Sequence, residues 1–475
     1  MRTRLRSTAA AALWVLALTV AAAAWGGVDI PAPASQSVTL ANGLKLILVP
    51  RHDVPLVAFT AVLRGGSRLD PGNYEGVASL TAELLTRGAG ARDADAFADT
   101  VEGAGGSLQA QARNESTIAN GEFLARDTEL MIKLLADALL RPHFDAAEFG
   151  QLRQRRIELL KANKDAQPDS LLSSYARALV FAGHPYGRPA SGSEASLARI
   201  RRADVLAYYH DQYGADRVTL VIAGDFEPEH VIAAVHAAFD GWARAPAVLP
   251  AMPVPQRPPG GRVLLVDAPG ATQTYFWLGT TGVDRNFPAR AALDLVNTDF
   301  GGGTLISMLN IELREKTGLT YGAYSYFARG SVTGEFGIRS FTKTDNTAAA
   351  VQLALTTLAK LHAAGVNAAE LKSTRSYMLG QFPLVYETAA EWASALADLE
   401  LYNRPLTDIT SYASDLQKVD AAAVAAVISS TFPDPKDLDL VLIGDAAKIR
   451  TVAAGFGTVV EKPLAAPDFT LPAWH

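Results

Sequence analysis

EGVASLTAELLTRG, residues 75–88, is the most informative segment of the sequence and is predicted to form a helix. Two segments typical of strands, residues 44–49 and 55–63, precede it and are expected to pair with each other. Farther along the chain, strand signals cluster and helical patterns follow them, instead of alternating regularly. This order favours an α+β fold in which helices pack on one face of a largely antiparallel sheet.

The same succession of patterns occurs a second time along the chain. Residues 216–225 have the pattern of a buried strand that ends in Gly-Asp, and residues 436–445 repeat it at an offset of 220 residues. Tyr-Gly-Arg-Pro at residues 186–189 is matched by Tyr-Asn-Arg-Pro at residues 402–405. Several matches in the same order at nearly one spacing indicate an internal duplication. We therefore predict two homologous domains.

A proline-rich segment separates the two copies. Residues 244–262, RAPAVLPAMPVPQRPPGGR, contain six prolines. Since proline fixes φ and lacks a backbone donor, this segment is predicted to be an extended linker. The predicted domains are residues 28–243 and 263–475.

The N-terminus has the composition of a secretory signal peptide. Three arginines precede an apolar run at residues 9–20, and residues 21–24 are all alanine. Residues 1–24 are therefore predicted to be a signal peptide cleaved near Ala24. An uncleaved anchor is the alternative, although the run is short for a span of about 20 residues. No second apolar stretch approaches that length, so we expect a periplasmic mature chain without a membrane span.

Composition narrows the classes of function further. Removal of the leader's three arginines changes the net charge from −6 to −9, and no basic cluster suggests nucleic-acid binding. The chain has no cysteine, which excludes disulfides, thiolate–zinc sites and cysteine nucleophiles. None of the eight histidines lies four residues from another, as a zinc-binding helix requires, so no metal site is predicted.

Six segments, in the same order, resemble those of the insulinase/pitrilysin zinc peptidases (inverzincins) and of the mitochondrial processing peptidase subunits. The chain is most similar to the short bacterial members, which have two homologous domains. The matching segments are LANGLKLILVPRHDVPLV at 40–57, the helix at 75–88, GAGGSLQAQARNES at 103–116, GHPYGRP at 183–189, VTLVIAGDF at 218–226 and FGGGTLISMLNIELREKTGLTYGAYS at 300–325.

The zinc motif of that family, H-x-x-E-H, is not kept. In the motif, two histidines one helical turn apart bind zinc, and the glutamate beside the second serves as general base. The corresponding residues here are Ser79, Ala82 and Glu83. The third ligand of the family, a glutamate, falls on Leu159 or Leu160. The resemblance thus implies a chain with no metal ligands and no cofactor of its own.

The second half keeps a different part of the family's active site. There, an arginine and a tyrosine seven residues apart face the zinc from another domain or subunit, bind the substrate backbone and support charge on the scissile carbonyl. Arg314 and Tyr321 match this pair, and their N–H and O–H donors suit that role. From the sequence alone, an ordinary helix end capped near Gly318 is the alternative. The glycines at 301–303 lack the Lys-Ser/Thr of a phosphate-binding loop.

Residues 105–112 resemble the family's edge strand, to which substrate adds as an extra strand. Main-chain hydrogen bonds provide the affinity in this mode of binding, which tolerates many sequences. We therefore expect Ser107, Leu108, Gln109 and Ala110 to bind peptide. An ordinary strand after a glycine-rich turn is an equal alternative.

Taken together, the resemblance implies a pseudo-peptidase subunit that pairs with a zinc-bearing homologue. It would contribute substrate-binding and transition-state contacts to peptide hydrolysis, and zinc is expected in the partner. The main alternative is a non-catalytic scaffold or peptide-binding protein, possibly a homodimer. A third alternative, an exported solute-binding protein, is disfavoured by the duplication. A fourth, an active peptidase with an unusual site, would be tested by measuring the zinc content of the purified protein.

Overall fold

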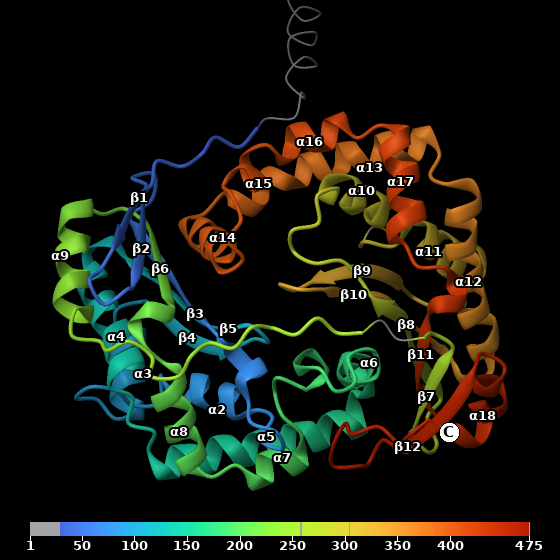
Figure 1. The fold of residues 1–475 in the computed structure, drawn as a ribbon, viewed down its shortest axis with the longest axis horizontal. Helices are drawn as coiled ribbons and strands as arrows, with labels where there is room; N and C mark the ends of the chain where they lie inside the picture. The colour runs from blue at the N-terminus through green and yellow to red at the C-terminus, as the bar shows by residue number, and fades with distance from the viewer. Residues whose placement is uncertain (1–28, 257–258, 304, 475) are drawn as a thin grey trace, which may run out of the picture.

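A computed structural model describes residues 29–256, 259–303 and 305–474 (Figure 1). The predicted signal peptide, residues 1–24, lies outside these residues. The described chain forms two sheets, each made by one half of the sequence and flanked by helices. The predicted α+β fold with two homologous halves is confirmed.

The first half of the chain forms a six-stranded sheet in the order β1-β2-β6-β3-β5-β4. Neighbouring strands are antiparallel, except β2 and β6, which are parallel. Every residue of β6 is buried, as expected for an apolar strand covered on both faces. The strands are β1 (Gln36–Thr39), β2 (Lys45–Pro50), β3 (Leu56–Arg64), β4 (Ser107–Ala112), β5 (Ser116–Leu124) and β6 (Val218–Gly224).

The second half repeats this topology in the order β12-β7-β11-β8-β10-β9. Five strands correspond in place and direction: β7 to β2, β8 to β3, β9 to β4, β10 to β5 and β11 to β6. The sixth strand differs, because β12 comes last in the chain and pairs parallel with β7. The strands are β7 (Arg262–Asp267), β8 (Gln273–Thr281), β9 (Ala323–Arg329), β10 (Gly334–Lys343), β11 (Asp439–Gly444) and β12 (Thr458–Pro463).

Most helices cover one face of their own half's sheet. Leu80 of α2, Leu135 of α4 and Val235 of α9 share a core with Leu46 and Phe59 of the first sheet. The helices of the first half are α2 (Val77–Leu84), α3 (Ala94–Gly103), α4 (Thr128–Leu140), α5 (Ala146–Ala166), α6 (Leu172–Val180), α7 (Glu194–Arg199), α8 (Arg202–Gln212) and α9 (Pro228–Phe239). Those of the second half are α10 (Arg290–Phe300), α11 (Met308–Asn310), α12 (Thr347–Ala364), α13 (Ala368–Gln381), α14 (Ala389–Leu401), α15 (Thr407–Thr410), α16 (Tyr412–Lys418), α17 (Ala421–Thr431) and α18 (Ala446–Ala454).

The other face of each sheet is covered by a helix from the opposite half. α6 of the first half packs on β8 and β11, where Tyr175 meets the cluster that contains Trp277. α14 of the second half packs on β3 and β6, where Trp392 belongs to the cluster that contains Val62 and Val221. Since each fully buried large apolar side chain contributes about 1.5–3 kcal/mol, this exchange couples the two halves strongly.

The segment between the halves has no regular structure. From the end of α9 at Phe239 to the start of β7 at Arg262, the described residues form no helix or strand, and the predicted linker at 244–262 occupies nearly the same stretch. It is the yellow-green chain that crosses the middle of Figure 1. The limits 28–243 and 263–475 stay a prediction, because each half also covers the other's sheet.

Within the described residues, no single helix is long and apolar enough to cross a membrane. A bent pair of segments, Thr344–Ala364 and Ala368–Tyr386, meets that test jointly, by length and composition only. α12, which forms most of the first segment, buries Val351, Leu358 and Leu361 in the core of the second half.

Candidate functional site

The helix that matches the family's zinc-binding helix is α2, and a buried carboxylate holds its start. Asp70 accepts hydrogen bonds from the backbone N–H of Gly76, at 2.7 Å, and of Ala78, at 3.0 Å. Gly76 has a φ of +99°, and a Cβ there would lie 2.9 Å from the Cα of Gly192. The sequence therefore needs glycine at this position to begin α2 against the loop that precedes α7.

The three motif positions of α2 differ in their surroundings. Ser79 and Ala82 are buried, whereas the side chain of Glu83 is 35% exposed and pairs with Arg156 of α5. An ion pair thus joins α2 to α5 where the family has ligands. Such a partly exposed pair contributes at most about 1 kcal/mol.

The expected third-ligand position is also occupied by residues that cannot bind metal. Leu159 is largely exposed, and Leu160 packs on the edges of two core clusters. Among the described residues, no group of three or more histidines, aspartates and glutamates could hold a metal ion. Arg156 was not predicted from the sequence, although a residue three or four positions before Leu159 and Leu160 lies on the same helix face.

A cavity of about 360 Å³ lies beside the motif positions, and we call it the α2 pocket. Guanidinium groups and hydroxyls dominate its lining. The lining residues are Ser79, Glu83, Gln111, Ala112, Arg156, Ser173, Ser174, Arg177, Arg188, Pro189, Ala190 and Ser191. The chemistry of this set suits an anion, because three of the residues are permanently cationic.

The carboxyl groups next to the α2 pocket are poor counterions for its arginines. Burial raises the pKa of Asp70 to about 8, although the two backbone N–H groups and the charge of Arg188 oppose that rise. Burial also raises the pKa of Glu335, whose carboxylate lies 3.6 Å from the guanidinium of Arg177. Near neutral pH, Asp70 is therefore mostly uncharged and contributes little negative charge beside Arg188.

Arg314 and Tyr321 lie in the second half and do not line the α2 pocket. Arg314 is on a π-helical turn, Ile311–Lys316, a rare geometry that often marks functional sites. Both side chains are exposed, Tyr321 to 84%. Within the described part of the chain, neither side chain makes a hydrogen bond or an ion pair.

The backbone around this pair is nevertheless held firmly. Asn310 accepts a hydrogen bond from the backbone N–H of Ala323 at 3.0 Å. The hydroxyl of Ser340 donates to Thr320 and to the carbonyl of Gly322, at 3.1 and 2.8 Å. The segment therefore presents two free side-chain donors from a fixed backbone, which is the arrangement that transition-state stabilisation requires.

The predicted peptide-binding residues lie at an open edge of the first sheet. Ser107, Leu108, Gln109 and Ala110 belong to β4, which pairs only with β5 among the described strands. An edge strand presents unpaired backbone groups to which another chain can add. β4 continues through Gln111 and Ala112 into the lining of the α2 pocket, so the open edge and the pocket are contiguous.

A second cavity, of about 390 Å³, lies between the two halves. Tyr186 donates a hydrogen bond of 2.8 Å to Glu115, and that carboxylate also accepts one from Ser331 of the other half. Burial raises the pKa of Tyr186 above its usual range. Arg177 lines both cavities, which connects this network to the α2 pocket. Tyr186 was not predicted to be functional, and its segment was identified only as a match to the family and as a repeat of residues 402–405.

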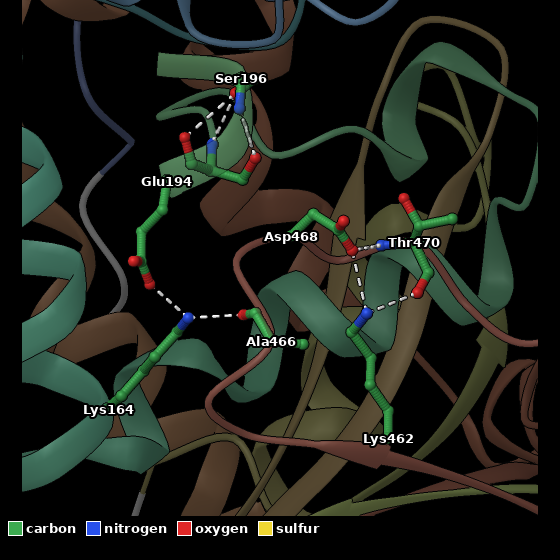
Figure 2. Close-up of polar contacts among 8 residues, drawn as sticks. Lys164, Glu194, Ser196, Lys462, Ala466, Asp468 and Thr470 are labelled. Atoms are coloured by element: carbon green, nitrogen blue, oxygen red, sulfur yellow. Dashed lines mark hydrogen bonds and ion pairs between the residues drawn. The ribbon is translucent and has the colours of Figure 1, made fainter. Parts of the chain in front are cut away.

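The C-terminal segment fastens the second half to α5. Figure 2 shows Lys164, near the end of α5, between the carboxylate of Glu194 and the carbonyl of Ala466, to which it donates at 2.6 Å. On the other side, Lys462 of β12 donates to Asp468 at 2.9 Å. Because α5 also lines the α2 pocket, these contacts help to fix the position of that wall.

Two family models match the chain. The one described as insulinase (peptidase family M16) matches residues 48–193, and the one described as peptidase M16 inactive domain matches residues 199–378. An uncharacterized zinc protease of Mycobacterium leprae (strain TN) is 27% identical over 390 residues, which is 82% of this chain and 86% of that protein. Another from Bacillus subtilis (strain 168) is 23% identical over 405 residues, which is 85% of this chain and 97% of that protein.

Two solved structures have the same fold. One is described as a peptidase M16 inactive domain from Pseudomonas fluorescens, with a TM-score of 0.81 and 25% identity. The match covers 90% of this chain and 99% of that chain. A protease from Helicobacter pylori has a TM-score of 0.79 and 21% identity, and the match covers 87% of this chain and 100% of that chain.

Proposed function

Since the chain belongs to the insulinase family of peptidases (peptidase family M16), we propose that it is a zinc-free subunit that pairs with a zinc-bearing homologue. In this complex it would contribute Arg314 and Tyr321 to peptide hydrolysis at the partner's zinc. The exposed, unpartnered donors of this pair, on a fixed backbone within the described chain, carry the proposal. The replacements at Ser79, Ala82 and Glu83 support a division of labour between two chains.

The side chains of the pair suit the charge that develops during hydrolysis. A zinc ion in the partner would polarise the scissile carbonyl and supply the attacking water. Arg314 offers a planar set of N–H donors, and Tyr321 offers one O–H donor. Hydrogen bonds from these donors strengthen as negative charge grows on the carbonyl oxygen, and such differential binding is what lowers the barrier.

Co-expression with a homologue that carries H-x-x-E-H tests the proposal. We expect a heterodimer that hydrolyses peptides, with zinc in the partner. Arg314→Ala should lower kcat by about 100-fold while the dimer still forms, because one transition-state donor is lost. Glu315→Ala, an exposed neighbour on the same turn, is the matched control and should leave turnover unchanged. Normal turnover by Arg314→Ala would refute the role of this pair.

The proposal includes export to the periplasm. Its support is the leader-like composition of residues 1–24. Fractionation of cells that express the full chain, followed by N-terminal sequencing, is expected to find a mature chain that starts close to Ala24. Recovery of the uncut chain from the membrane would instead support the anchor.

A non-catalytic peptide-binding protein is the second candidate, and two observations favour it. The Glu83–Arg156 ion pair occupies the motif region, and β4 keeps an open edge among the described strands. In that case the chain would bind unfolded peptide without any partner and would form no stable complex with a zinc-bearing subunit.

A further inference from the structure

We propose that the α2 pocket binds the C-terminal carboxylate of an extended peptide that lies along β4. The inference rests on the second candidate function, the binding of peptide along β4 without a partner, and it concerns this chain alone. In this proposal, the region where the family binds metal instead binds a negatively charged peptide terminus through arginines at the end of the peptide-binding edge strand.

The pocket has more positive charge than its own carboxylates neutralise. Among the described residues, three guanidinium groups line it, whereas Glu83 is its only lining carboxylate. Each guanidinium has five N–H donors. Within the described residues, Arg156 contacts Glu83, Arg177 contacts Glu335, and Arg188 donates to the backbone carbonyl of Asp70. Most donors of the three groups therefore remain available to a ligand.

The raised pKa values of the neighbouring acids add to this excess of positive charge, because protonated acids carry no negative charge. Burial keeps the pKa of Asp70 at about 8, so its carboxyl group contributes little negative charge beside Arg188 near neutral pH. The pKa of Glu335 is raised by burial as well. Charge-assisted hydrogen bonds from arginine to a carboxylate are short, frequently bidentate and roughly twice as strong as neutral ones.

The position of the pocket favours a peptide terminus over a free anion. Ser107, Leu108, Gln109 and Ala110 form the open edge, and the next two residues of the strand line the pocket. A peptide strand paired with β4 and ending beside Ala112 would place its carboxylate among the arginines. Four serine hydroxyls in the lining offer further donors, and a volume of about 360 Å³ leaves room for the terminal side chain.

The test compares three short, labelled, unstructured peptides, identical up to the last residue, by fluorescence anisotropy with the purified mature chain. The first has a free C-terminus, the second a C-terminal amide, and the third an amide with glutamate at its last position. We expect the first to bind about tenfold more tightly than the other two, since a bidentate ionic contact is lost in both.

A matched pair of variants locates the effect. Arg156→Gln should bring the affinity for the free-acid peptide close to that for the amide. Arg155→Gln removes the same charge from an exposed neighbour on α5 and should change nothing. Thermal unfolding of both variants verifies that they are folded, and the affinity for the amide serves as an internal control.

The outcomes separate this inference from the function on which it rests. If the free acid and the amide bind equally well, the pocket does not recognise the terminus, although peptide binding stands. Equal binding of the glutamate peptide would assign the pocket to side-chain carboxylates and overturn the terminal assignment. If none of the three peptides binds, both the inference and the peptide-binding function are wrong.

Discussion

The raised pKa of Asp70 leads to a quantitative prediction about stability. The carboxyl group is almost fully buried, and its pKa is about 8 in the folded chain against 3.8 in a model peptide. Between these values the folded chain holds a proton that the unfolded chain releases, so stability falls as pH rises. The slope for one such group is about 1.4 kcal/mol per pH unit, or about 2.7 kcal/mol from pH 5 to pH 7.

Asp70→Asn removes this titration but keeps the size of the side chain. At pH 5 the variant should be less stable than the parent by about 1–3 kcal/mol, because the amide has one oxygen for the two N–H groups of Gly76 and Ala78. Between pH 5 and pH 7 the variant should gain about 2.7 kcal/mol relative to the parent, since only the parent loses stability over this interval, so at pH 7 the variant should be at least about as stable as the parent.

Urea unfolding at pH 5, 6 and 7 measures both chains under the same conditions. Asp145→Asn provides a control of opposite sign, because hydrogen bonds from Glu148 and Ala147 lower the pKa of that N-cap carboxylate below its usual range. Its contribution is lost only as the pH falls through that lower value, so the Asp145→Asn deficit should stay constant from pH 5 to pH 7. Parallel pH profiles for the parent and Asp70→Asn would refute the reasoning.

Two further substitutions test the packing. Trp392 lies on α14, the helix of the second half that covers the first sheet, and Trp392→Ala should lower the free energy of unfolding by about 3–5 kcal/mol in urea melts. A loss below about 1 kcal/mol would mean that α14 is not part of the core. Gly76→Ala should destabilise the chain by more than about 1 kcal/mol, because φ is +99° and the backbone at Gly192 is close, whereas Gly72→Ala has open space and should be nearly neutral in the same melts.

Local patterns were enough to predict much of this fold. Alternating and continuous apolar runs predicted β2, β3 and β6, and the repeated order of motifs predicted the second sheet. The exchange of α6 and α14 could not be predicted in this way. Nothing in residues 172–180 or 389–401 specifies which sheet they cover, since an apolar helix face packs equally well on either copy of a duplicated sheet.

The candidate site was predicted in the same uneven manner. The resemblance to the family's zinc-binding helix gave the motif positions on α2, and the resemblance of residues 105–112 to the family's edge strand agrees with the place of β4 at a sheet edge. The arginines of the α2 pocket come from α5, α6 and the loop after α6, which only the tertiary fold brings together. Arg156 alone had a sequence signal, since it shares a helix face with the expected ligand position.

The proposed completion of a zinc-bearing homologue's active site by this chain can be tested by reconstitution from the separate chains. The purified mature chain, the homologue and their mixture are each assayed for hydrolysis of a quenched fluorescent peptide, with zinc content determined in parallel. If this chain completes the site, we expect turnover by the mixture far above that of either chain, with zinc in the homologue only. Stoichiometric zinc and turnover in this chain alone, or no gain on mixing, would contradict it.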